Sequence, residues 1–136
     1  MTIEVILDTK RNVTAFHVRG HAQPPFEESE DMACAAVSAL LQTAVIALKK
    51  LTGGGKFYFK RKGCLSLMLP CALEGEACGK ALFLLDSVYL GIREIARAYP
   101  EYIYLEEVLE EARKNTVSRG KKPHTQISMR RRMSNG

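Results

Sequence analysis

The sequence predicts an α+β domain in which a mainly antiparallel sheet carries two packed helices, in the order ββαββαβ. Two pairs of short alternating segments, each joined by a polar turn, are typical of β-hairpins, and each pair precedes a long segment with helical character. The 136 residues are 46% hydrophobic and 26% charged, as in one globular domain. This composition excludes a collagen, a disordered polymer and a two-domain enzyme.

The first hairpin is predicted at the start of the chain. Ile3, Val5 and Leu7 alternate with polar residues, and a polar turn over 9–12 leads into a run of mostly β-branched and aromatic residues over 13–20. Residues 20–30 follow with two prolines and several acidic side chains. That composition favours a loop.

The first helix is expected over Met32–Leu51, with Asp31 as its N-cap and Gly53–Gly55 as its end. The segment is apolar nearly all round, whereas a helix on a protein surface shows one apolar stripe. One small sheet cannot cover such a helix. We therefore expect both the second helix and a second copy of the protein to pack against it, which predicts a homodimer.

The remaining elements follow from the same patterns. A second hairpin is expected over 57–62 and 65–69, and apolar residues at helical spacing predict a second helix over about 79–99, stopped by Pro100. A short last strand is expected over 102–105 and a helical segment over 106–114.

Positive charge is concentrated at the C-terminal end. From Arg113 onward the chain has eight basic residues and no acidic one, so the body carries a net charge of about −3 although the whole chain carries +5. We predict a folded domain over 1–112 and a basic, mostly disordered tail over 113–136. Such a tail either binds RNA through its phosphates or only keeps the protein soluble; the sequence leaves both open.

The cysteines and the N-terminal segment bear on the compartment. The first ten residues alternate like a strand and do not resemble a secretion signal, and the 17-residue apolar stretch 32–48 is short for a membrane span. We therefore expect a cytoplasmic protein with reduced thiols and no membrane contact. Cys64, Cys71 and Cys78 are seven residues apart and form no close pair, so no metal or other cofactor is predicted.

Two reactive residues flank the loop. His21 follows the second strand, and Cys34 is expected in the first turn of the long helix, where unpaired backbone N–H groups favour a thiolate and can hold an oxyanion. A nearby imidazole could take the thiol proton and later protonate a leaving amine. Each residue also has a plain interpretation, Cys34 as a small buried side chain and His21 as a solvated loop residue.

The combined pattern Gly20-His21-Ala22, then DMACAAVSAL over 31–40, resembles the ribosomal-processing cysteine protease family. The resemblance implies a cytoplasmic bacterial endopeptidase, usually a homodimer, that removes a short N-terminal extension from the precursor of a large-subunit ribosomal protein. Cys34 matches the family nucleophile and His21 the catalytic histidine. Asp31 and Ser38 match further motif positions with supporting roles.

The loop departs from the family pattern, because Ser29 and Glu30 precede Asp31 where family members commonly carry glycine. Phe26 on this loop either contacts substrate or anchors the loop. The leading hypothesis is thus a cysteine endopeptidase with a Cys34–His21 dyad. The alternative is a non-catalytic dimer that associates with the ribosome or RNA through its basic tail.

Overall fold

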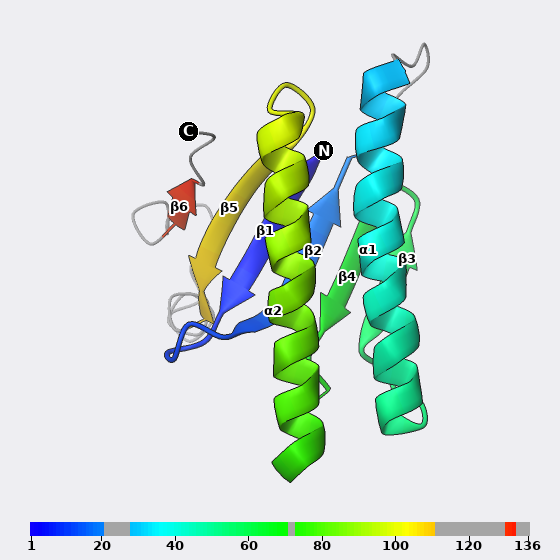
Figure 1. Ribbon diagram of the computed structural model, residues 1–136, viewed down its shortest axis with the longest axis vertical. Coiled ribbons are helices and arrows are strands. Elements are labelled where there is room, and N and C mark those ends of the chain that lie inside the picture. Colours follow the sequence, from blue (N-terminus) through cyan, green and yellow to red (C-terminus); the bar gives the residue numbers. More distant parts are fainter. Residues whose placement is uncertain (21–27, 71–72, 111–129, 133–136) are drawn as a thin grey trace.

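The computed structural model describes residues 1–20, 28–70, 73–110 and 130–132, and these form a layer of strands covered on one face by a layer of helices (Figure 1). In chain order the elements are β1 (Thr2–Leu7), β2 (Val13–Arg19), α1 (Glu28–Thr52), β3 (Tyr58–Arg61), β4 (Cys64–Met68), α2 (Gly75–Ala98), β5 (Tyr104–Leu109) and β6 (Arg130–Arg132). The predicted α+β class and the order ββαββαβ are confirmed, with β6 as an addition.

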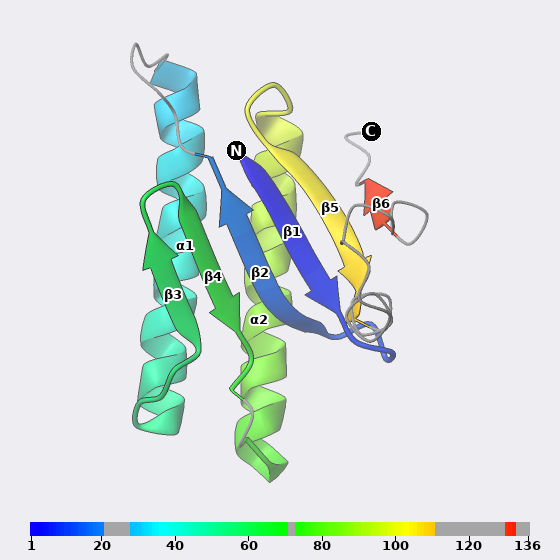
Figure 2. The ribbon, with the colours of Figure 1, turned by 180° about the vertical axis from the view of Figure 1, so that it is seen from behind.

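Within the described residues the sheet has the strand order β3-β4-β2-β1-β5-β6. All neighbouring strands are antiparallel except β1 and β5, which run parallel. Viewed from behind, the sheet lies in front of both helices (Figure 2). Both predicted hairpins are present, so the alternation of apolar and polar residues identified four of the strands.

The main core lies between the sheet and the helices. Alternate residues of β1 and β2 point toward the helices, because successive side chains of a strand face opposite sides. On α1 the buried residues recur at helical spacing: Ala33, Val37, Leu41, Ala44, Val45 and Leu48. A second, small apolar cluster of Ile6, Ala15 and Val108, with Met68 beside it, belongs to the opposite face of the sheet.

The helix α1 begins at Glu28, four residues before the predicted start. The expectation that Asp31 caps this helix is therefore wrong, and Asp31 lies inside the first turn. Acidic residues are favourable there because the N-terminal end of a helix carries a partial positive charge. The segment Glu-Ser-Glu-Asp is thus compatible with helix, although its polar composition favoured a loop in the sequence.

The predicted helix over 106–114 is also wrong over residues 106–109. Residues 104–109 form β5, in register with the whole of β1 from Thr2 to Leu7. Leu105 and Val108 are buried on opposite faces of the sheet. Pairing with β1 provides backbone hydrogen bonds that outweigh the local helix propensity of two glutamates.

By length and composition α1 is apolar enough to cross a membrane, with a mean hydropathy of 1.7 over its best window, of which 33% is buried. In the fold this helix packs lengthwise on the sheet and beside α2 (Figure 1). Its apolar character therefore reflects one face in the core and a second face toward the outside. The second face is the surface that the sequence assigned to a partner copy.

The C-terminal tail is described only at residues 130–132. These form β6, antiparallel to β5, which differs from the disorder expected for this segment. Residues 111–129 and 133–136 lie outside the described residues, so the boundary between a domain over 1–112 and a tail over 113–136 stays a prediction.

Candidate active site

The Cys34 thiol is free and half-buried, in the second turn of α1. The sequence had placed it in the first turn. Only the first four N–H groups of a helix lack a partner inside the helix, and here they belong to residues 28–31. The effect of the helix terminus falls off after the first turn. It therefore acts less directly on this thiol than the sequence suggested.

The thiol lies on the flank of α1 that faces away from α2. Leu40 marks one flank, because it lies against Gly91 of α2. Gln42 marks the other, because its side-chain amide donates a hydrogen bond of 3.1 Å to the Tyr58 hydroxyl of β3. Cys34 and Ser38 precede Gln42 at four-residue spacing and so share its flank.

Asp31 and Ser38 are exposed on either side of the cysteine along the helix. Asp31 precedes Cys34 by three residues and Ser38 follows it by four, so both carry a polar group one turn away from the thiol. The structure thus brings together three of the five site residues from the sequence. The sequence did not indicate the Gln42–Tyr58 hydrogen bond at the end of this row, because that contact requires the position of β3 relative to α1.

The end of β2 fixes the point from which His21 departs. The Gly20 amide donates a hydrogen bond of 2.9 Å to the Gly63 carbonyl. Gly20 has φ +82°, a conformation that favours glycine, and an added Cβ would lie 3.7 Å from the Met1 Cα. His21 and Phe26 themselves lie outside the described residues.

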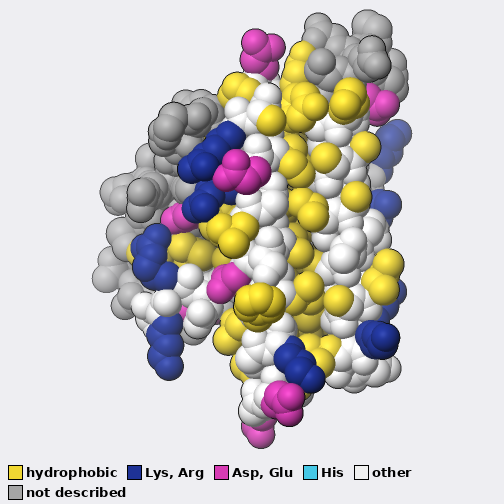
Figure 3. Space-filling view, in the orientation of Figure 1, with side chains coloured by type: hydrophobic (Ala, Val, Ile, Leu, Met, Phe, Trp, Pro, Cys, Tyr) yellow, Lys and Arg dark blue, Asp and Glu magenta, His cyan; other side chains and the backbone are white. Residues whose placement is uncertain are grey.

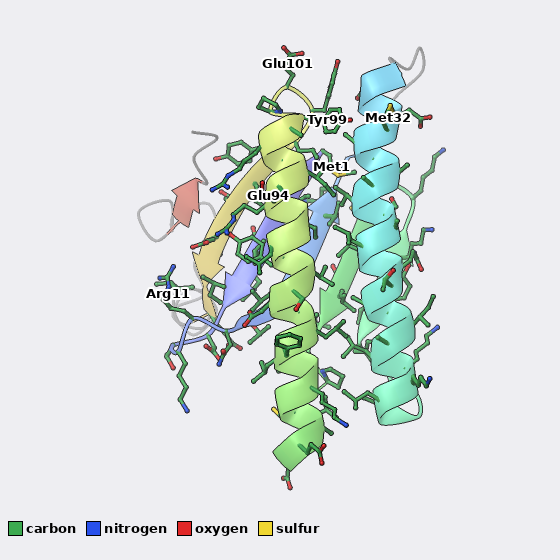
Figure 4. All side chains as sticks on the ribbon, viewed as in Figure 1. Met1, Arg11, Met32, Glu94, Tyr99 and Glu101 are labelled. Carbon is green, nitrogen blue, oxygen red and sulfur yellow. The ribbon has the colours of Figure 1, made fainter. Side chains whose placement is uncertain are left out.

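Several elements meet at this end of the molecule. Figure 4 shows Met1, Met32 and Tyr99 there, at the start of β1, the start of α1 and the end of α2. The Met1 amino group donates a hydrogen bond of 2.9 Å to the Tyr102 carbonyl. The start of α1, which carries the cysteine, and the end of β2 are therefore supported by the same packed end of the sheet.

The arrangement suits a thiol nucleophile better than a metal centre. In the part of the chain that the structure describes, no three His, Cys, Asp or Glu side chains gather as ligands. Cys64 is exposed and Cys78 half-buried, each as a free thiol, whereas Cys71 lies outside the described residues. A half-exposed thiol with a hydroxyl and a carboxylate one turn away can attack a carbonyl once a base takes its proton.

An α+β fold in which the second strand is followed in the sequence by Gly-His-Ala, beside a helix that carries a half-buried free cysteine, fits the class of thiol hydrolases. The chain belongs to the Cysteine protease Prp family, whose model matches residues 1–104. The predicted family and the predicted cysteine endopeptidase class are therefore confirmed.

Comparison with individual relatives supports the same family assignment. The chain is 30% identical to the ribosomal processing cysteine protease Prp of Bacillus subtilis (strain 168), over 67% of this chain and 82% of the relative. A crystal structure of the essential ribosomal processing protease Prp from S. aureus, in complex with a substrate peptide, superposes with a TM-score of 0.63 at 22% identity, covering 78% of this chain and 97% of that chain. A Streptococcus mutans protein gives 0.65 at 22% identity, covering 80% and 94%.

Proposed function

We propose that this protein removes the N-terminal extension of a large-subunit ribosomal protein precursor, with Cys34 as nucleophile and His21 as general base and acid. The observation that carries the proposal is the free, half-buried Cys34 thiol on α1, in a chain of the Prp family whose second strand ends at Arg19, two residues before His21. The name of the Bacillus subtilis relative and the substrate-peptide complex of the S. aureus protease support the substrate class.

In the proposed reaction the His21 imidazole takes the proton from Sγ of Cys34. The thiolate attacks the scissile carbonyl carbon, forming a C–S bond and an oxyanion. The oxyanion collapses, the C–N bond breaks, and His21 returns the proton to the leaving amine. Water then attacks the thioester with His21 again as base, releasing the carboxylic acid product and the free thiol. The S. aureus protease has been crystallised with a covalently linked product peptide, which supports a covalent step.

Activation of the thiol rests mainly on His21 in this proposal, because Cys34 lies beyond the unpaired amides of the first turn. Asp31 would orient the imidazole, and Ser38 would donate a hydrogen bond near the thiolate or the oxyanion. Phe26 would contact the substrate. No metal ion or organic cofactor takes part in these steps.

The proposal is tested with the full chain and a precursor that bears its N-terminal extension, by following product mass. Wild type should cleave, Cys34→Ala should not, and Cys64→Ala should cleave like wild type because its exposed thiol lies on β4, away from α1. Cleavage by Cys34→Ala would remove Cys34 as the nucleophile. If wild type and both variants are folded and none of them cleaves the precursor, this precursor is excluded as the substrate.

We also propose that the active protein is a cytoplasmic homodimer joined through the outer face of the helices. Exposed apolar side chains gather over α1 and α2 (Figure 3), including Met32 and Ile46 on α1, with Phe83 and Leu90 on α2. Their exposed fractions are 53–76%. Large apolar patches of this kind are typical of protein interfaces. The free state of Cys34, Cys64 and Cys78 agrees with a reducing compartment.

A contact between the basic tail and rRNA would assist such an enzyme by raising its concentration near ribosomal precursors. The eight basic residues after Ala112 support this auxiliary role. Replacing Lys121 and Lys122 by Glu should then weaken RNA binding, measured across a salt titration. An unchanged affinity would exclude the contribution of this lysine pair.

A further inference from the structure

The two edges of the sheet differ in how they are protected. The β3 edge carries exposed cationic side chains at Lys60 and Arg61, and charged residues, above all lysines, discourage pairing with another strand. The β5 edge has no lysine and instead carries the adjacent acids Glu106 and Glu107. Without a neighbour, half of the backbone groups of β5 would be an open template for strand addition.

In this chain β6 lies along that edge. Arg132 is the register partner of Glu106, and Arg131 is the register partner of Glu107. Residues directly opposite in an antiparallel pair are close enough for opposite charges to stabilise the pairing. Two consecutive arginine positions of β6 are therefore the register partners of two consecutive glutamates of β5, and Arg130 is the register partner of Val108.

The acids at this edge are held away from water. Glu106 is 7% exposed, and its register partner on the parallel strand β1, Glu4, is 8% exposed. Two carboxylates at neighbouring positions repel each other, and burial strengthens the repulsion. A cation next in the same row lowers this energy, and the row runs from Glu4 through Glu106 to Arg132.

On the other face of the sheet Glu107 is also largely buried, with 11% of its side chain exposed. It accepts hydrogen bonds from the Tyr89 hydroxyl at 2.7 Å and from Arg11 at 3.1 Å. Both faces of β5 thus bring negative charge to the same edge. This edge is chemically suited to a basic, extended segment.

The segment that occupies the edge is not part of the family match. That match ends at residue 104, the first residue of β5, and the S. aureus protease is covered over 97% of its length by 78% of this chain. The β6 strand is therefore a feature of this chain's C-terminal extension. It lies across the sheet from α1, which carries Cys34 (Figure 1).

We propose that the outer edge of β5 is a binding site for a basic strand, and that Arg130–Arg132 of the same chain occupies it. The register sets Arg132 opposite Glu106 and Arg131 opposite Glu107, so opposite charges occupy directly opposed positions, while the backbone of β6 pairs with the open edge. The C-terminal extension is then a built-in edge strand. It holds its most basic triplet at the edge of the domain.

Hydrogen exchange of the backbone amides over 104–109 tests this proposal in the full chain. The double variant Arg131→Glu, Arg132→Glu should speed exchange of the β5 amides that face away from β1 by at least about tenfold, because its charges repel the glutamates. The matched control Lys121→Glu, Lys122→Glu makes the same charge change in the same tail and should leave this exchange unchanged. Adding Glu106→Arg to Arg132→Glu should restore protection lost in the single Arg132 variant.

Equal protection in the arginine variant and in wild type would overturn the proposal. If the lysine control loses protection as well, the effect comes from the overall charge of the tail and not from the arginine positions, and this outcome also contradicts the proposal. Protection in wild type should be independent of protein concentration. A protection that disappears on dilution would show that the strand comes from a second copy, and the assignment to the same chain would fail.

Discussion

Leu40 of α1 lies so close to Gly91 of α2 that a Cβ added to Gly91 would come within 2.9 Å of the Leu40 Cδ1. The two helices pack side by side at this point because one of them lacks a side chain. Glycine inside a helix is otherwise unfavourable by about 0.5–1 kcal/mol relative to alanine. At position 91 the helical backbone would therefore favour alanine, whereas the close contact with Leu40 favours glycine.

This relationship predicts different outcomes at two glycines of α2. Gly79 has nothing within 4 Å of an added Cβ, so Gly79→Ala should raise the free energy of unfolding by about 0.5–1 kcal/mol. Gly91→Ala should give less or nothing because the Leu40 methyl must move, and Gly91→Leu should lower it by about 1–3 kcal/mol. Urea unfolding at one protein concentration measures all three variants.

Leu40→Ala provides the control for this pair. In the Leu40→Ala background the space above position 91 is open, so Gly91→Leu should lower the free energy of unfolding by less than it does in wild type. Two outcomes would contradict the close approach of Leu40 to Gly91. One is an equal gain in the free energy of unfolding from Gly79→Ala and Gly91→Ala, and the other is additivity of Leu40→Ala and Gly91→Leu in the double variant.

The sequence predicted most of the fold because its hairpins and helices depend on local patterns. The alternation from Ile3 to Leu7 and the helical spacing of Ala81, Leu85, Val88 and Ile92 both agree with the burial in the structure. The segment 106–109 was mistaken for helix because its structure depends on β1, a hundred residues away. Pairing with a distant parallel strand leaves no signal in the local sequence.

The site was predicted from a motif, and the physical argument for it was only partly right. The motif placed Asp31, Cys34 and Ser38 on one helix, as the structure does. The same motif suggested that the helix starts at Asp31, and the start at Glu28 moves the cysteine into the second turn. The contact between Gln42 and Tyr58 could not be predicted, since it requires the position of β3 relative to α1.

The histidines provide a paired test of the proposed dyad. His21→Ala should lower kcat by about 10²–10⁴-fold, because it removes the group that moves the proton. His17→Ala should leave kcat within about twofold, although the hydrogen bond between His17 Nδ1 and Ser66 Oγ (2.9 Å) is lost and the free energy of unfolding falls by about 1 kcal/mol. Product mass and urea unfolding measure the two effects. Similar losses of kcat in both variants would remove the special role of His21.

The dimer proposal predicts a different outcome for two exposed phenylalanines. Phe83 is 76% exposed on the outer face of α2, and Phe59 is 52% exposed on β3. Phe83→Glu should raise the dimer dissociation constant by about 10²-fold, because it removes roughly 2–3 kcal/mol of apolar burial and adds a charge. Phe59→Glu should leave the dimer intact.

Light scattering over a concentration series gives the mass in each case. Wild type should have twice the chain mass at micromolar concentration. A wild-type monomer contradicts the dimer itself, whereas a dimeric Phe83→Glu variant contradicts only the choice of the helix face.

Removing the groups around Glu107 should destabilise the fold in a definite order. Tyr89→Phe removes the hydroxyl that donates to the largely buried Glu107 carboxylate at 2.7 Å. This change should lower the free energy of unfolding by about 1.5–3 kcal/mol. Arg11→Ala should cost less than about 1 kcal/mol, because 59% of the Arg11 side chain is exposed and its ion pair is screened by water. In 1 M salt the Arg11 effect should vanish and the Tyr89 effect should persist, since salt screens exposed charges far more than buried hydrogen bonds. Urea unfolding at low salt and again in 1 M salt measures the free energy of unfolding of both variants. An Arg11→Ala variant that is more destabilised than Tyr89→Phe would contradict this order.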